Sequence, residues 1–181
     1  MASVGGSEQL RLFCALRLPD DVLAALVAWQ REHVPAGRVV PAGNLHVTLA
    51  FLGNRPAGDV PAIAGELAGA AARADAIVLR PARYRETRSV GMIVLDDVAG
   101  AGGRLADELG ARLEAIGVYR REDRPWLAHV TVTRFRARPG LNPPLSGIGE
   151  VSPSDAAVYV SRLRPGGALY EPLEIAVLGG R

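Results

Sequence analysis

Two stretches of this sequence alternate apolar and polar residues with the period of a β-strand, and both carry the same short motif. The first begins His46-Val47-Thr48 and the second His129-Val130-Thr131. Residues i and i+2 of a strand share one face, so each histidine points the same way as the threonine that follows it. Each stretch therefore predicts a strand with one apolar face toward a core and an imidazole beside a hydroxyl on the opposite face.

The rest of the chain divides into further strands and three helices. Strand-like patterns occupy residues 10–18, 39–40, 76–82, 90–95, 156–163 and 169–177. Apolar residues recur at helical spacing over 20–33, 59–73 and 101–116. Asp20 or Asp21 is expected to cap the first of these helices and Asp59 the second. Residues 83–89 are expected to form a loop between two strands.

The order of these elements is the same before both motif strands: a strand, a helix, and a turn-rich connection. One such unit begins near Leu10 and the other near Val90. Because no linker separates the units, residues 9–181 are expected to form a single bilobed domain after a flexible tail at 1–8. The two motif strands are expected to face each other across a cleft between the lobes.

The composition excludes several kinds of chemistry. All 21 basic residues are arginine and none is lysine, although the formal net charge is only +2. A lysyl-adenylate ligase, a Walker-type phosphate loop and a Schiff-base enzyme each need a lysine. Arginine remains well suited to phosphate, because its planar guanidinium can bind two oxygens at once.

The single cysteine, Cys14, rules out an internal disulfide and a cysteine-based metal cluster. The first nine residues contain no basic residue and no long apolar run, so no secretory signal is predicted. No stretch approaches the roughly 18 apolar residues of a membrane span. We therefore expect a cytoplasmic protein with no membrane association.

Two imidazoles and two hydroxyls facing one another suit phosphoryl or acyl transfer. One neutral histidine can take a proton from an attacking hydroxyl or water while a protonated partner gives one to the leaving oxygen. The threonine hydroxyls can hydrogen-bond the non-bridging phosphate oxygens. A serine hydrolase fits poorly because no G-x-S-x-G sequence is present, and a third ligand for a two-histidine zinc site is not evident.

Two arginine-rich segments favour a polyanionic substrate. The first surrounds the second motif and consists of Arg120, Arg121, Arg124, Arg134, Arg136 and Arg138, against Glu122 and Asp123. The second consists of Arg80, Arg83, Arg85 and Arg88, against Glu86. The alternative is that these segments have no role in binding and only keep an alanine-rich protein soluble. Candidate base-stacking residues are Phe51, Tyr84, Tyr119 and Trp126.

The motifs resemble one known family, the two-histidine phosphoesterases, and within it the RNA 2',3'-cyclic phosphodiesterases, also called 2'-5' RNA ligases. The resemblance rests on the segments 12–16, 44–53 and 124–134, and on Val160-Ser161-Arg162-Leu163 with Gly167 and Tyr170. It therefore extends over nearly the whole chain. It implies an α+β fold of two lobes of antiparallel sheet with flanking helices, related by a pseudo-twofold axis.

The resemblance also implies a reaction and its residues. RNA 2',3'-cyclic phosphate ends would be hydrolysed to 2'-phosphomonoesters, with no metal and no cofactor. His46 would be the proton donor and His129 the proton acceptor, and Thr48 and Thr131 would bind the phosphate. Arg134 matches the family's arginine after the second motif and is a further candidate for phosphate binding. Strand alternation, however, predicts that Arg134 faces the side opposite to His129.

Three functions remain open from the sequence. The first is the RNA cyclic phosphodiesterase, with weak ATP-independent 2'-5' ligation when a 5'-hydroxyl replaces water. The second is a phosphodiesterase for a small nucleotide, such as an ADP-ribose cyclic phosphate or a 2'-5' oligoadenylate. The third is a non-catalytic RNA-end binder. The expected partners are thus RNA ends or small cyclic nucleotides, and a monomer with no obligate protein partner is predicted.

Overall fold

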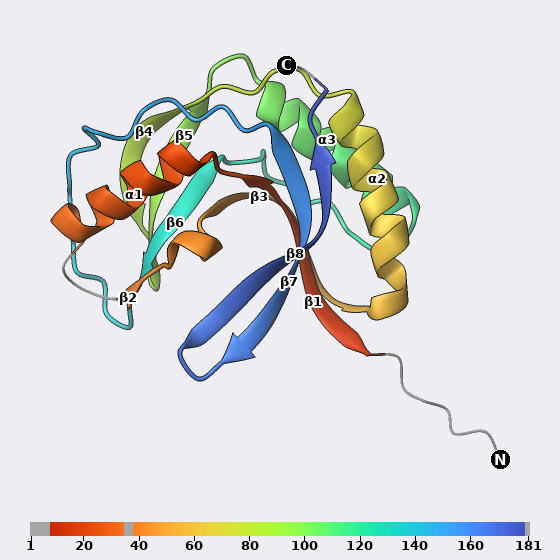
Figure 1. The fold of residues 1–181 in the computed structure, drawn as a ribbon, viewed down its shortest axis with the longest axis horizontal. Coiled ribbons are helices and arrows are strands. Elements are labelled where there is room, and N and C mark those ends of the chain that lie inside the picture. The colour runs from red at the N-terminus through yellow and green to blue at the C-terminus, as the bar shows by residue number, and fades with distance from the viewer. Residues whose placement is uncertain (1–7, 35–37, 180–181) are drawn as a thin grey trace.

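Two four-stranded antiparallel sheets and three α-helices make up the computed structural model, which describes residues 8–34 and 38–179 (Figure 1). The first sheet has the strand order β3-β1-β7-β8 and the second has the order β2-β6-β5-β4. The strands are β1 (Gln9–Arg17), β2 (Arg38–Val39), β3 (His46–Pro56), β4 (Leu79–Glu86), β5 (Val90–Asp97), β6 (His129–Arg134), β7 (Asp155–Arg164) and β8 (Gly167–Val177). The helices are α1 (Asp20–His33), α2 (Val60–Ala72) and α3 (Ala101–Ala115), with short 3₁₀ turns η1 (Ala42–Asn44) and η2 (Ala57–Asp59).

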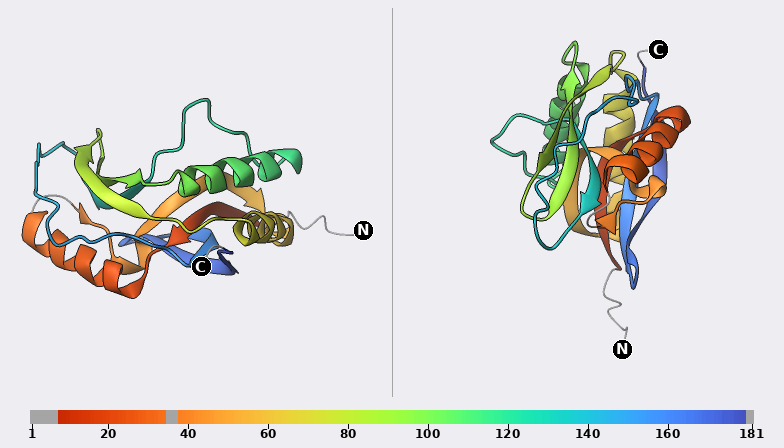
Figure 2. Two further views of the ribbon diagram at one scale, coloured as in Figure 1. Left: turned by 90° about the horizontal axis from the view of Figure 1, so that it is seen from above. Right: turned by 90° about the vertical axis from the view of Figure 1, so that its left-hand side faces the viewer.

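The repeated order predicted from the sequence is present as a repeated topology. In the first lobe β1 leads through α1 to β3, and β1 and β3 pair antiparallel. In the second lobe β5 leads through α3 to β6, and these strands also pair antiparallel. The motif strands β3 and β6 contact each other across the two sheets. In the right-hand view of Figure 2 they lie between β4 and β5 on one side and β7 and β8 on the other. The predicted α+β architecture with two antiparallel lobes is confirmed.

Helices and sheets share one continuous apolar core, because each helix packs across the lobes. In α1, Val22, Leu26 and Trp29 are buried at helical spacing. The buried Gln30 side chain donates hydrogen bonds to the carbonyls of Val40 (3.0 Å) and Val132 (2.7 Å), which ties α1 to the second sheet. Helix α2 packs on β7, β8 and α3. The core therefore fixes the position of one motif strand relative to the other.

Strand β4 differs from the sequence prediction. It runs over Leu79–Glu86, so residues 76–78 lie outside it and most of the expected 83–89 loop is strand. The charged run pairs with the apolar strand β5, and Glu86 is buried at its end. The Glu86 carboxylate accepts hydrogen bonds from the amides of Gly140 (2.9 Å) and Leu141 (2.9 Å) and from Arg138 (3.1 Å). These hydrogen-bond donors come from a loop more than 50 residues away, so the local hydrophobic pattern could not predict that Glu86 is buried.

The helix caps also differ in part. The N-cap of α1 is Pro19, and Asp20 and Asp21 lie in the first helical turn, where their charge favours the positive end of the helix dipole. Asp59 is the N-cap of α2 as expected, but its side chain pairs with Arg55 (3.2 Å) and makes no capping hydrogen bond. The predicted tail at residues 1–8 lies outside the described residues except for Glu8. Within 8–34 and 38–179 no helix is long and apolar enough to cross a membrane.

Candidate active site

The two motif histidines are held in the same way. Nδ1 of His46 lies 2.8 Å from the carbonyl oxygen of Asn44, and Nδ1 of His129 lies 2.9 Å from the carbonyl oxygen of Leu127. A carbonyl oxygen can only accept, so Nδ1 carries the hydrogen in both rings. In each case the acceptor is two residues before the histidine. The hydrogen bonds leave Nε2 of both rings as the nitrogen that can exchange a proton with a ligand.

In the first motif, the threonine Thr48 is hydrogen-bonded to the histidine of the same motif, His46. Nε2 of His46 lies 3.0 Å from Oγ1 of Thr48, which agrees with the shared strand face predicted from the i, i+2 spacing. When His46 is neutral with its hydrogen on Nδ1, Nε2 accepts and the Thr48 hydroxyl donates. The hydroxyl is therefore oriented by the imidazole before any substrate arrives.

A β-bulge follows the H-x-T sequence in both motif strands. Thr48 and Ala50 pair with consecutive residues of β1, so Leu49 is the extra residue. Thr131 and Thr133 pair with consecutive residues of β5, so Val132 is the extra residue. A bulge shifts the alternation by one position. Both bulges lie three residues after the histidine. The two lobes therefore share this feature of the strand as well as the H-x-T sequence.

The bulges bring the fifth residue after each histidine back to the cleft. That residue is Phe51 on β3 and Arg134 on β6, and both line the cleft described below. The expectation that Arg134 faces away from the cleft, which assumed a regular strand, is wrong for this reason. The two lobes therefore present an aromatic ring at one position and a guanidinium at its counterpart.

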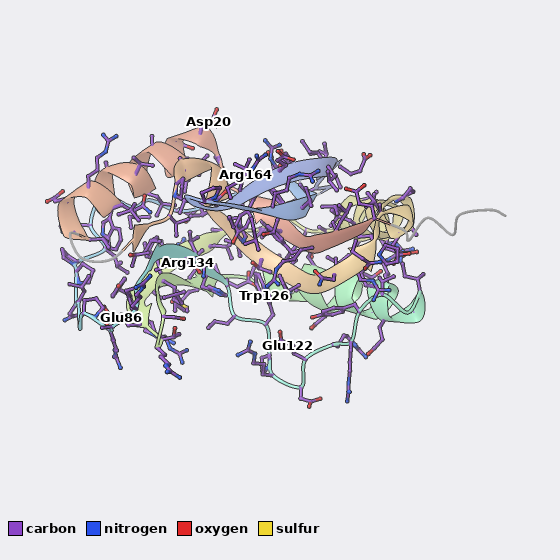
Figure 3. The ribbon with its side chains drawn as sticks, turned by 90° about the horizontal axis from the view of Figure 1, so that it is seen from below. Asp20, Glu86, Glu122, Trp126, Arg134 and Arg164 are labelled. Carbon is purple, nitrogen blue, oxygen red and sulfur yellow. The ribbon has the colours of Figure 1, made fainter. Side chains whose placement is uncertain are left out.

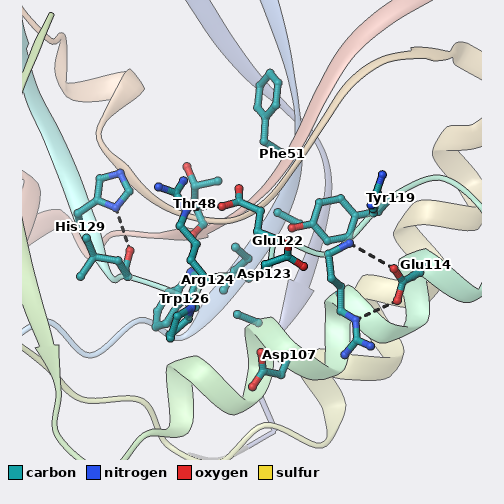
Figure 4. Close-up of a pocket in the computed structure, with 18 of the residues that line it drawn as sticks. Thr48, Phe51, Asp107, Glu114, Tyr119, Glu122, Asp123, Arg124, Trp126 and His129 are labelled. Carbon is teal, nitrogen blue, oxygen red and sulfur yellow. Dashed lines mark hydrogen bonds and ion pairs between the residues drawn. The ribbon is translucent and has the colours of Figure 1, made fainter. Parts of the chain in front are cut away.

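The cleft has an inner and an outer section. The inner section has a volume of 410 Å³ and is lined by His46, Thr48, Thr131 and Arg134, together with residues of β1 and the β7–β8 hairpin. The outer section has a volume of 880 Å³ and extends from His129 along the 119–127 loop and α3 (Figure 4). Thr48 and Phe51 line both sections. All five sequence-predicted site residues thus lie in one continuous cleft that joins the two lobes.

His46 lies among aromatic rings. Its ring centroid is 4.9 Å from that of Phe13 and 5.4 Å from that of Tyr170. The pKa of His46 is lowered from 6.5 to about 4, chiefly by burial and to a smaller extent by the charges of His129 and Arg134, while the hydrogen bond to Asn44 acts in the opposite direction. His46 is therefore neutral at neutral pH in the free protein.

Asn44 is a structural partner of the site to which the sequence analysis gave no role. Its side-chain nitrogen donates to the carbonyl of Ala168 (2.7 Å), and its side-chain oxygen accepts from the amide of Tyr170 (3.1 Å). Its own carbonyl receives the Nδ1 hydrogen of His46. One residue thus connects the β7–β8 hairpin to the imidazole. The sequence signal was an amide residue two positions before the motif, but its partners are more than 120 residues away.

The candidate stacking residues separate into two groups. Phe51, Tyr119 and Trp126 line the outer section, whereas Tyr84 donates a hydrogen bond to Glu86 and does not line the cleft. The indole nitrogen of Trp126 donates to the carbonyl of Thr48 (2.9 Å), so Trp126 also connects the 119–127 loop to the first motif strand.

The arginine-rich segments are less positive than their sequences indicate. Ion pairs neutralise Arg121 with Glu114, Arg124 with Glu122, Arg138 with Glu86 and Arg80 with Glu150. Two of these carboxylates, Glu114 and Glu150, lie outside the two arginine-rich segments. Among the described residues, no group of three or more His, Cys, Asp or Glu is arranged to hold a metal ion.

Comparison with known proteins places the chain in a family. Residues 16–85 match the model of the LigT like Phosphoesterase family. The RNA 2',3'-cyclic phosphodiesterase of Thermus thermophilus is 33% identical over 183 residues, covering 94% of this chain and 91% of that protein. The chain belongs to the LigT-like phosphoesterases. A second relative in this family, the RNA 2',3'-cyclic phosphodiesterase of Escherichia coli, is 29% identical over 178 residues, covering 93% of this chain and 96% of that protein.

Solved structures share the fold over most of the chain. The structure of TT0787 from Thermus thermophilus matches with a TM-score of 0.80 at 31% identity, covering 95% of this chain and all of that one. Escherichia coli LigT in complex with 3'-AMP matches with a TM-score of 0.80 at 27% identity, covering 94% of this chain and 99% of that one. The similarity spans both lobes and therefore the whole cleft.

Proposed function

We propose that this protein hydrolyses 2',3'-cyclic phosphates at RNA ends to 2'-phosphomonoesters, with His46 and His129 as the acid–base pair. The observation that carries the proposal is the matched pair of imidazoles, each with Nδ1 bound to a backbone carbonyl and Nε2 left for proton exchange. Two relatives that are aligned over most of the chain are named for this activity.

In the proposed reaction a water molecule attacks phosphorus and the bond between phosphorus and O3' breaks. Nε2 of His129 takes the proton of the water, and protonated His46 gives its Nε2 proton to O3'. Protonated His46 no longer accepts from Thr48, so Thr48 and Thr131 donate hydrogen bonds to the non-bridging oxygens, and Arg134 balances their charge. In weak 2'-5' ligation a 5'-hydroxyl takes the place of water, so neither ATP nor a lysine is required.

The donor role requires His46 to gain a proton with the substrate. In the free protein His46 is neutral, because its pKa is lowered to about 4. The negative charge of a bound cyclic phosphate raises that pKa, since an anion nearby favours the imidazolium. The low pKa in the free protein equally supports the exchanged assignment, in which His46 takes the proton of the water and His129 supplies one to O3'.

A substrate with sulfur in place of O3' distinguishes the two assignments. A thiolate leaves without protonation, so loss of the general acid has little effect on its release, whereas loss of the general base remains harmful. If His46 is the acid, His46→Ala should hydrolyse the sulfur substrate nearly as fast as the wild type and His129→Ala should not. The opposite pattern would exchange the roles.

The first experiment is an assay on a short RNA ending in 2',3'-cyclic phosphate, with a chelator present throughout. We expect the wild type to form a 2'-phosphate and His46→Ala or His129→Ala to lose about 10²–10⁴-fold in rate. His33→Ala is the matched control, because this third histidine lies at the end of α1 and does not line the cleft. Activity that survives both motif substitutions would contradict the proposal, and activity lost with the chelator would show a metal requirement.

A small-nucleotide substrate is the second candidate. The inner section, at 410 Å³, is large enough for one nucleotide, and Escherichia coli LigT has been solved with 3'-AMP. Equal rates on a cyclic mononucleotide and on an RNA end would favour this candidate. Under the third, non-catalytic possibility, the wild type binds the RNA end without converting it. For either substrate we propose a monomer that acts in the cytoplasm.

A further inference from the structure

The two sections of the cleft differ in charge. The outer section is lined by Arg85, Arg120, Arg121 and Arg124 and by four acidic residues, Asp107, Glu114, Glu122 and Asp123, so its formal charges balance. The inner section is lined by Arg11 and Arg134 and, among the residues that the structure describes, by no acidic residue. A polyanion gains electrostatic attraction in the inner section and little in the outer one.

The positive inner section continues into a groove over the first sheet. This groove has a volume of 340 Å³ and lies between the start of β1 and the end of β7. Arg11 and Ser161 line both the groove and the inner section, and they are register partners on paired strands. Arg164 also lines the groove and lies three residues farther along β7, about 10 Å at the rise of a strand. Figure 3 labels the two ends of this path, Arg134 on β6 and Arg164 at the β7–β8 hairpin.

The cations on this path are available to a ligand. Within the described part of the chain, Arg11, Arg134 and Arg164 form no ion pair with a carboxylate, and all three residues are exposed. Arg11 instead lies over the Phe51 ring, with its guanidinium carbon 4.9 Å from the ring centroid. The neighbouring Arg162 is neutralised by Glu171 (2.9 Å), and of the described acidic residues only Glu8 lines the groove.

We infer that the RNA chain leading to the cyclic phosphate runs from the inner section over Arg11 and Ser161 to Arg164, and that the outer section does not hold its phosphates. The occupant is a single-stranded phosphodiester chain, because successive anions at short spacing match successive unpaired guanidinium groups. This inference rests on the proposed function, since the chain is that of the RNA whose end is hydrolysed.

The test compares two substrates: a 2',3'-cyclic mononucleotide and a hexanucleotide with the same cyclic end. The measured quantity is the length ratio, kcat/KM for the hexanucleotide divided by kcat/KM for the mononucleotide. Arg11→Gln and Arg164→Gln each remove one charge from the proposed path. Arg85→Gln and Arg120→Gln are matched controls that each remove one exposed arginine from the outer section.

We expect a length ratio above one for the wild type and a fall of about threefold for each path variant, the size of one exposed charge pair. The slope of log kcat/KM against log salt for the hexanucleotide should become shallower by about 0.7 per path variant. The two control variants should keep the wild-type length ratio and slope. Arg164→Gln is the sharper of the two path variants, because this residue lies outside the inner section.

Other results would contradict either the inferred path of the RNA chain or the proposed function. A fall in the length ratio for the controls but not for the path variants would place the RNA chain in the outer section and overturn the inference. A wild-type length ratio of one, or a ratio that no substitution changes, would overturn it as well, while leaving mononucleotide hydrolysis intact. Failure of the wild type to hydrolyse either substrate would instead remove the proposed function.

Discussion

The burial of His46 predicts how the free energy of unfolding changes with pH. Its pKa is lowered from 6.5 to about 4 in the folded protein, chiefly by burial. Between these pH values the unfolded chain binds a proton at this position that the folded protein does not. Stability therefore falls as the pH drops from above 6.5 toward 4, and the contribution is constant outside that window.

The size of the effect follows from the two pKa values. At about pH 5 the unfolded imidazole is almost fully protonated, while the folded imidazole is protonated in roughly one molecule in ten. Integrated from about pH 8 to about pH 5, this difference in proton binding lowers the free energy of unfolding by about 2 kcal/mol. His46→Gln removes the titrating group while keeping a side chain that can hydrogen-bond, so this cost should be absent from the variant.

Urea unfolding of both proteins at about pH 8 and about pH 5 measures the effect. The wild type should lose about 2 kcal/mol more than His46→Gln between the two conditions, and all other titrating groups cancel in this double difference. Because the chain has only three histidines, an NMR titration can assign the low pKa directly. Equal losses in the two proteins would show that His46 keeps an ordinary pKa, and the account of its burial among aromatic rings would be wrong.

Three further predictions concern the support of the site. Asn44→Ala should lower stability by about 2 kcal/mol, through two lost hydrogen bonds, and reduce kcat at least tenfold with a smaller change in KM. Asn44→Asp keeps the acceptor for Tyr170 but turns a carboxylate oxygen toward the Ala168 carbonyl, so it should be at least as destabilising, and a milder loss in urea unfolding would contradict this contact. Gly91→Ala should destabilise by about 2 kcal/mol in urea unfolding, because the added methyl meets the hydroxyl of Tyr84, whereas Gly65→Ala, with open space around it on α2, should not; equal effects would contradict this contact. Trp126→Phe keeps an aromatic six-membered ring and loses the hydrogen bond to the β3 backbone, so we expect a loss of about 1 kcal/mol and a severalfold lower kcat, and an unchanged kcat would show that this bond does not position the motif strand.

The sequence predicted most of the secondary structure, and it predicted that the histidine and threonine of a motif share one strand face. Both depend on local periodicity. The helices at α1, α2 and α3 begin and end within one residue of the predicted bounds. The shared face of His46 and Thr48 follows from the geometry of any strand. Strand β4 was misplaced because its charged residues carry no apolar alternation, and its pairing with β5 is a long-range contact.

Interactions between distant segments decided what the sequence could not. The position of Arg134 depends on a bulge at Val132, and a bulge exists only in relation to the register of the partner strand. The charge of the arginine-rich loops depends on carboxylates brought from other elements, such as Glu114 and Glu150. The role of Asn44 depends on a hairpin more than 120 residues away.

The sequence by itself therefore determined the repeated lobe, the two H-x-T strands, the absence of lysine and the candidates for the reacting side chains. Tertiary structure decided which further residues reach the cleft, how far the pKa of His46 is lowered, and which section of the cleft keeps unbalanced positive charge. The physical reason is one of range. Side-chain direction within a strand is set by neighbouring residues, whereas strand register, burial and ion pairing are set by segments that meet only after the chain has folded.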